Sequence, residues 1–139
     1  MGDSMNGNGG NWEGKAFEDM LFDYLDNGYL ESIITFFKHE PEQIFLIPKM
    51  LADERLRVKV GAFAIIEEIK EKNPESLNKI IPEITKLLNS VEKNIRGDAA
   101  YALEIIGSLE AKPALIEALQ KEEDPQVKEF IEDAIRSLK

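Results

Sequence analysis

The residues with chemically active side chains are few in kind and poorly placed for catalysis. The chain has 139 residues with no Cys and one His, which excludes disulfides, thiolate catalysis and Cys-based zinc sites. His39 lies beside Pro41 at an expected helix end, where interaction with terminal carbonyls is a simpler role than general base catalysis. Ser90, Ser108 and Ser137 have no nearby His to activate them. We therefore expect no catalytic residues and no cofactor.

Carboxylates are abundant, with 27 Asp and Glu against 17 Lys and Arg and a net charge of −10. Adjacent acids point in different directions on a helix, so they cannot share a metal or a proton by spacing alone. Glu104 could approach Glu67 or Asp133 across neighbouring helices, but a specific metal site is not expected. The charge also argues against nucleic acid as a partner, because phosphate binding requires clustered Lys and Arg. The adjacent acids are Glu67-Glu68, Glu122-Glu123-Asp124 and Glu132-Asp133.

An internal repeat specifies the elements that must position these side chains. An apolar residue followed by a cation recurs at Val58-Lys59, Ile95-Arg96 and Val127-Lys128, and we call the three apolar residues the anchors. Apolar residues recur 4, 7, 8 and 11 positions after each anchor, which is the spacing of one helix face. Others recur 8 and 11 positions before it, on a preceding helix. Such a repeat is typical of a solenoid in which each unit is a helical hairpin. The predicted fold class is all-α.

Gly, Pro and Asn divide the chain into about eight helices. Residues 1–11 are mostly Gly and Asn and are expected to form a disordered tail. Residues 12–139 are expected to form a single solenoid domain of about four hairpins, over 12–39, 41–72, 74–107 and 108–138. Pro48 and Pro82 should bend the helices that contain them. No apolar run is long enough to span a bilayer and no signal segment opens the chain, so we expect a cytoplasmic protein off the membrane.

The segment 95–135 resembles HEAT repeats, particularly the short repeats also found in phycobilisome-lyase-type proteins. The similarity is clearest over residues 74–139 and extends more weakly over 41–72. It implies a right-handed α–α superhelix, in which first helices face outward and second helices line a concave surface. It implies no particular ligand. The motifs that carry the resemblance are Asp124-Pro125-Gln126-Val127-Lys128, Ala99-Ala100 with Ala102-Leu103, Ile106-Gly107 and Pro113-Ala114-Leu115-Ile116.

The resemblance also implies a ladder of ion pairs between neighbouring units. In HEAT-type stacks, an acid three residues before the anchor usually pairs with the cation that follows an anchor. This acid is Asp124 in the last unit and Glu92 in the middle one, but Arg55 occupies the position in the earlier unit, so the ladder should be broken there. We expect the cations after the anchors to serve the ladder rather than to bind a ligand. These cations are Lys59, Arg96 and Lys128.

If second helices line the concave surface, the residues 2, 6 and 9 positions after each anchor lie opposite the core face. The strip that they form is predicted to be apolar at one end and acidic towards the other. Tyr101 at its centre is the best candidate for a binding anchor, because an exposed aromatic ring combines apolar area with a polar tip. The alternative is that the ring packs over Ala64 or its neighbours. The predicted strip consists of Val60, Ala64, Glu67, Gly97, Tyr101, Glu104, Glu129, Asp133 and Arg136.

These features favour a noncatalytic scaffold for protein–protein interaction, with a concave acidic groove for a basic peptide or protein surface. An alternative, suggested only by the resemblance, is an accessory subunit or a chromophore-lyase-like protein acting on a small-molecule adduct. HEAT-type DNA glycosylases need a basic concave face and a buried catalytic acid, which the charge of −10 disfavours.

Aromatic residues are concentrated in the first two expected helices, and two interpretations of them stay open. They form either a hydrophobic cap that seals the end of the solenoid, or a groove for a partner helix or a second copy. A monomer or a weak dimer through the terminal helices is therefore expected. The aromatic residues are Trp12, Phe17, Phe22, Tyr24, Tyr29, Phe36 and Phe37.

Overall fold

The computed structural model describes residues 9–138, with side chains from residue 14 onward. This part of the chain folds into helices joined by short connections, without a β-strand, which confirms the predicted all-α class. Its α-helices are α1 (Gly9–Asp26), α2 (Leu30–His39), α3 (Ile47–Leu51), α4 (Leu56–Lys72), α5 (Ile81–Leu87), α6 (Lys93–Ile106), α7 (Lys112–Lys121) and α8 (Pro125–Ser137). Its 3-10 helices are η2 (Pro41–Leu46), η3 (Pro74–Ile80) and η4 (Leu109–Ala111).

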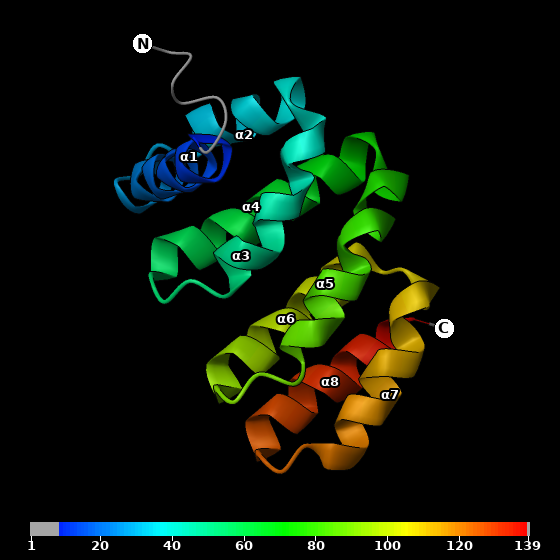
Figure 1. Ribbon diagram of the computed structural model, residues 1–139. Coiled ribbons are helices and arrows are strands. Elements are labelled where there is room, and N and C mark those ends of the chain that lie inside the picture. Colours follow the sequence, from blue (N-terminus) through cyan, green and yellow to red (C-terminus); the bar gives the residue numbers. More distant parts are fainter. Residues whose placement is uncertain (1–8, 139) are drawn as a thin grey trace.

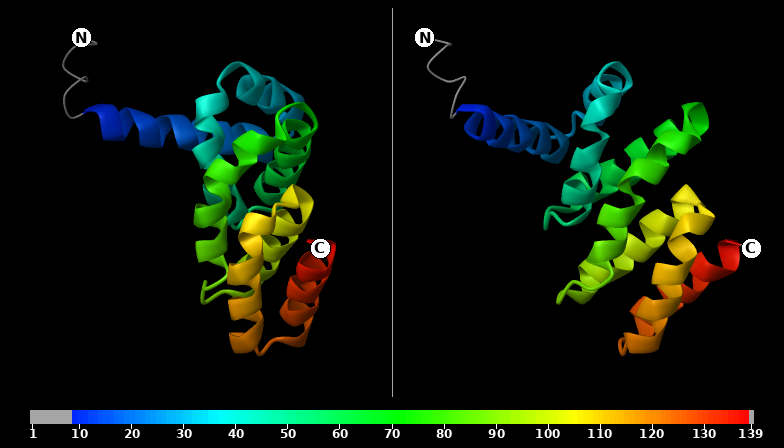
Figure 2. Two further views of the ribbon diagram at one scale, coloured as in Figure 1. Left: turned by 90° about the vertical axis from the view of Figure 1, so that its right-hand side faces the viewer. Right: turned by 45° about the vertical axis from the view of Figure 1, so that its right-hand side comes forward.

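The helices stack as successive hairpins in two layers (Figure 1). Helices α3, α5 and α7 form one layer, and each packs against the second helix of its own hairpin. The second helices α4, α6 and α8 pack side by side in the other layer. Helices α1 and α2 cover α4 at one end of the stack, while the N-terminal part of α1 extends away from it (Figure 2). The handedness of the superhelix stays a prediction.

A proline marks the start of the α-helical part of each first helix. Pro48, Pro82 and Pro113 each occupy the second residue of a short α-helix, directly after a 3-10 helix. Proline lacks an amide hydrogen, so it fits the first turn of a helix and breaks the hydrogen bonding of an interior turn. Where the sequence predicts one bent helix, the structure therefore has two helices of different type.

The anchors Val58, Ile95 and Val127 are all buried, and Val58 and Val127 belong to a hydrophobic core that runs through the stacked hairpins. The repeat register fails at Ile116, which is 43% exposed, while its neighbour Leu115 is buried. The connection between α7 and α8 is shorter than the one between α5 and α6. The same offset from the anchor therefore falls on a different side of α7.

Two glycines end helices in a left-handed conformation. Gly28 follows α1 with a φ of 95°, and Gly107 caps α6 with a φ of 71°, a left-handed conformation that is strained for residues with a Cβ. Helix α1 begins at Gly9, three residues before the predicted start. The rest of the predicted tail, residues 1–8, lies outside the described residues. Within the described chain, every helix is too short or too polar to cross a membrane.

Candidate functional site

Two hollows lie on the exposed side of the second helices, and six of the nine residues of the predicted strip divide between them. One, which we call the apolar hollow, has a volume of about 390 Å³ and lies over the N-terminal turns of α4, α6 and α8. The other, the acidic hollow, has a volume of about 860 Å³ and lies between α2 and the C-terminal halves of α4 and α6. Val60 and Gly97 line the apolar hollow, whereas Ala64, Glu67, Tyr101 and Glu104 line the acidic hollow.

The last unit contributes less to this surface than predicted. Glu129, Asp133 and Arg136 lie on α8 outside the linings of both hollows, and Asp133 forms an ion pair with Arg136. Glu67 and Glu104 are thus brought to one hollow, but Asp133 does not join them. Among the residues that the structure describes, no group of three or more His, Asp or Glu is arranged to hold a metal ion.

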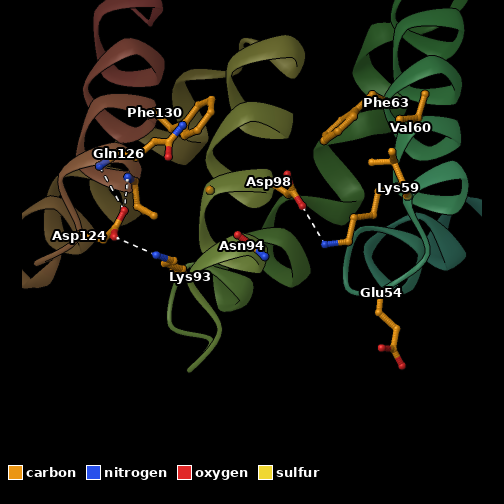
Figure 3. Close-up of a pocket in the computed structure, with 13 residues that line it drawn as sticks. Glu54, Lys59, Val60, Phe63, Lys93, Asn94, Asp98, Asp124, Gln126 and Phe130 are labelled. Carbon is orange, nitrogen blue, oxygen red and sulfur yellow. Dashed lines mark hydrogen bonds and ion pairs between the residues drawn. The ribbon is translucent and has the colours of Figure 1, made fainter.

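The walls of the apolar hollow come from three helices (Figure 3). Helix α4 contributes Leu56, Val60 and Phe63, and α8 contributes Phe130. Leu56 is 73% exposed and Val60 is 50% exposed. Gly97 of α6 is buried rather than exposed as the strip predicts, because Phe130 lies over it: a Cβ at Gly97 would be 3.4 Å from Cδ2 of Phe130.

Ion pairs neutralise most of the charge around the apolar hollow. Lys59 Nζ lies 3.0 Å from Asp98 Oδ2, and Lys93 Nζ lies 3.6 Å from Asp124 Oδ1 (Figure 3). Each pair joins neighbouring units, with Lys59 on α4 reaching α6 and Lys93 on α6 reaching the start of α8. Glu54 is the remaining charged residue of the described lining. The hollow is therefore nearly neutral, and its lining combines apolar side chains with paired charges and polar groups.

The acidic hollow has the opposite character, because carboxylates dominate its lining. Lys70 is the one cation among the described residues that line it, and its Nζ donates a hydrogen bond to the Ile105 carbonyl at 2.6 Å. Glu68 pairs with Lys38 at 3.2 Å and with Lys72 at 3.8 Å. The other four carboxylates form no ion pair with a described side chain. These four are Glu31, Glu67, Glu71 and Glu104.

Tyr101 lies at the boundary between the two hollows. Its ring packs edge-on against Phe63, with ring centroids 5.0 Å apart and an interplanar angle of 78°. The sequence alternative placed the ring over Ala64 or its neighbours, and Phe63 is such a neighbour. Tyr101 is nevertheless 40% exposed, so the ring combines an intramolecular contact with a surface available to a ligand.

The change from apolar to acidic runs along the helices. Val60 lies near the start of α4 and Glu67 two turns later, while Gly97 and Glu104 repeat this order on α6. Neighbouring second helices therefore place like residues side by side. Three further wall residues were not predicted, because they lie outside the positions opposite the core. Their signal is apolar character outside the core register: Leu56, Phe63 and Phe130.

Two of the three cations after the anchors, Lys59 and Arg96, bridge units, but with acids other than those predicted. Arg96 donates from Nε and Nη2 to the two carboxylate oxygens of Glu122, at 2.8 and 2.9 Å, and not to Asp124. Arg55 does not break the series, because its Nη1 donates to Asp23 of α1 at 2.8 Å. Lys128 has no ion pair with the described side chains.

A recurring turn positions the start of each second helix. The side chain five residues before each anchor accepts a hydrogen bond from the backbone N–H two residues later: Asp53 from Arg55 at 2.8 Å, Ser90 from Glu92 at 3.1 Å and Glu122 from Asp124 at 3.1 Å. Of these three side chains, only Glu122 also pairs with a cation of the preceding unit, Arg96. Lys59 instead pairs with Asp98, three residues after the anchor Ile95, so neither of these two acids is at the predicted third position before an anchor.

The aromatic cluster of the first hairpin is divided between core and surface. Phe22 and Phe37 are buried, and Phe17 and Phe36 pack against the core. Tyr24 and Tyr29 are exposed on the outside, with ring centroids 5.4 Å apart. The side chain of Trp12 lies outside the described side chains. The phenylalanines form part of a cap over α4, while the tyrosines remain exposed.

Comparison with known families agrees with this architecture. A model of the family described as HEAT repeats matches residues 45–136, the segment that holds the hairpins α3/α4, α5/α6 and α7/α8. Comparisons with curated proteins and with solved structures gave no match. The matched segment covers most of the chain and includes all three anchors. The chain therefore belongs to the HEAT-repeat family.

Proposed function

We propose that this protein is a noncatalytic interaction module that binds a cationic segment of a protein partner in the acidic hollow. HEAT repeats commonly mediate protein–protein interaction. The observation that carries the proposal is the gathering of four carboxylates without intramolecular ion pairs in one hollow beside an exposed Tyr101. These carboxylates are Glu31, Glu67, Glu71 and Glu104.

The physical chemistry of the hollow favours Lys and Arg as ligands. Carboxylates on three helices attract a cation together, and the C-terminal ends of α4 and α6 add partial negative charge from their carbonyls. The exposed face of Tyr101 can also receive a guanidinium or ammonium group. The ammonium group of Lys70 does not occupy the place of this ligand cation, since it donates a hydrogen bond to the Ile105 carbonyl.

The test compares the protein with the double variant Tyr101→Ala, Glu104→Lys. The native protein is used as bait to isolate a partner, and the purified partner is then titrated against both proteins by calorimetry. Loss of an aromatic anchor and reversal of one charge should weaken binding by about tenfold or more. Circular dichroism must show that the variant remains folded.

The matched control carries the same changes outside the hollow, Tyr29→Ala with Glu117→Lys. Tyr29 is an exposed tyrosine and Glu117 an exposed glutamate on α7. The control should bind the partner as the native protein does. If the Tyr101, Glu104 variant also binds with unchanged affinity, the acidic hollow is not the binding site and the proposal is wrong.

A further inference from the structure

We propose that the apolar and acidic hollows form one bipartite site, for a peptide segment that carries large apolar side chains at one end and Lys or Arg at the other. The inference rests on the proposed function, because the cationic end occupies the acidic hollow. It adds a second half to the site, fixes the direction of the peptide along α4 and specifies the spacing of its two ends.

The first observation is an apolar surface that the fold leaves uncovered. Leu56, Val60 and Phe63 follow one another at spacings of four and three residues, so they form a single stripe on α4. Single exposed aliphatic residues are ordinary on protein surfaces. Here the stripe instead borders a hollow with Phe130 of α8 on its opposite wall (Figure 3).

The charges around the apolar hollow select an apolar occupant. Lys59 is already paired with Asp98, and Lys93 with Asp124, so a charged ligand would have to compete with existing partners at these positions. Glu54 has no ion pair with a described side chain, but it points away from the apolar side chains of the lining (Figure 3). An apolar side chain needs no such exchange, and it gains by removing the walls of the hollow from water. A Leu, Met or Phe side chain is therefore the expected ligand of this half.

The two hollows are neighbours and share one boundary. Phe63 lines the apolar hollow, Tyr101 lines the acidic hollow, and their rings are in contact. A peptide that crosses this pair reaches both hollows without leaving the surface. Its cationic end is fixed by complementarity to the unpaired glutamates, so its apolar end lies over the N-terminal turns of α4, α6 and α8.

The spacing of the two ends follows from the geometry of α4. Val60 and Glu71 are about three helical turns apart, which is roughly 16 Å at 1.5 Å per residue. An extended chain covers this distance with about five residues, at about 3.3 Å per residue. We therefore expect the apolar and cationic side chains of the ligand to be about five residues apart in an extended segment.

Synthetic peptides, in which the spacing between the apolar and cationic ends can be chosen, test the inference directly. The bipartite probe carries Leu-Phe and Arg-Arg joined by a Gly/Ser spacer of about five residues, and it is made in both chain directions. The comparison probes carry Arg-Arg with the spacer alone, or both pairs without a spacer. Fluorescence anisotropy at low salt should give the bipartite probe, in one direction, an affinity about tenfold above that of either comparison probe.

The variant Leu56→Gln, Val60→Gln should remove this gain and leave binding of the Arg-Arg probe unchanged, since it alters no charge. The matched control, Val91→Gln with Leu109→Gln, changes two exposed apolar residues outside both hollows and should keep the gain. If the Arg-Arg probe binds but the Leu-Phe pair adds nothing, or if the Leu56, Val60 variant keeps the gain, the bipartite site is wrong while the proposed function stands. If no probe binds, the proposed function fails as well.

Discussion

Glu122 is the only buried charged residue among those the structure describes, at 7% exposed. Arg96 binds both of its carboxylate oxygens, and the Asp124 backbone N–H donates a further hydrogen bond. The hydrogen bonds from Arg96 hold the pKa of Glu122 below its usual value, against the opposing effect of burial. A carboxyl group with a lowered pKa in the folded state stabilises the fold above its unfolded pKa, and this stability is lost as pH falls through the folded value.

Glu122→Gln should therefore change both the free energy of unfolding and the way that this free energy depends on pH. Near pH 7 we expect the free energy of unfolding to fall by about 1–3 kcal/mol, because Arg96 loses its charged partner. Below about pH 4.5 the native protein should lose stability more steeply than the variant, since only the native protein must protonate this carboxylate.

Urea unfolding at several pH values measures both effects. Glu123→Gln, at the exposed neighbouring position, is the control and should follow the native curve. Parallel curves for the Glu122 variant and the native protein between neutral and acid pH would show that the pair with Arg96 does not govern acid stability.

At the scale of elements, side-chain caps distinguish the second helices from one another. Asp124 accepts hydrogen bonds from the backbone N–H groups of Gln126 and Val127 at the start of α8, at 3.1 and 3.0 Å. Glu92 occupies the corresponding position before α6 without a side-chain cap. Asp124→Ala should therefore lower the free energy of unfolding by about 1 kcal/mol, and Glu92→Ala should change it little. Thermal unfolding of the two variants measures the difference, and equal losses would contradict the assigned cap.

The contact between α1 and α4 depends on Gly61. A Cβ at this position would lie 2.9 Å from Cδ2 of Leu25, so a larger residue must displace Leu25 or the helix that carries it. Gly61→Val should destabilise the protein by about 1–3 kcal/mol. It should also increase amide hydrogen exchange in the part of α1 around Leu25.

A double-mutant cycle with Leu25→Ala separates this contact from the helix propensity of valine. Removing the Leu25 side chain relieves the clash, so Gly61→Val should cost less in the Leu25→Ala background than in the native one. Strictly additive effects would mean that the close approach of the two helices is not what Gly61 provides.

The sequence predicts the elements better than it predicts their surfaces. Burial of the anchors follows from periodicity, because Val58, Ile95 and Val127 lie on the apolar face of their own helices. Gly97 is covered by Phe130 of the next unit, and no pattern within α6 contains that contact. The burial that the repeat predicts for Ile116 is wrong for a similar reason, since the exposure of this residue depends on the length of the connection after α7. The hollows are made by the relative placement of neighbouring helices, so their walls were only partly predictable.

At the scale of the whole molecule, cations form ion pairs where hairpins meet. Each junction in the stack is bridged by ion pairs, which hold six of the Lys and Arg side chains between units. Among the hollows on the described surface, the acidic hollow contains the most carboxylates without an ion pair. The bridging pairs are Lys49–Glu18 and Arg55–Asp23, Lys38–Glu68, Lys59–Asp98, Lys93–Asp124 and Arg96–Glu122.

This distribution of charge predicts how salt affects the two halves of the bipartite site. The Debye length falls from about 10 Å at 0.1 M salt to about 3 Å at 1 M, so added salt screens the exposed glutamates of the acidic hollow. Affinity for the Arg-Arg probe should therefore fall steeply with salt, chiefly through a slower association rate, because the net charge of −10 no longer attracts the peptide over distance. The additional affinity supplied by the Leu-Phe pair should persist, since burial of apolar surface does not depend on that screening.

Stopped-flow fluorescence across a salt series measures the association and dissociation rates of the probes separately. Glu67→Lys with Glu71→Lys should flatten the salt dependence, and an unchanged slope in that variant would place the electrostatic attraction outside the acidic hollow.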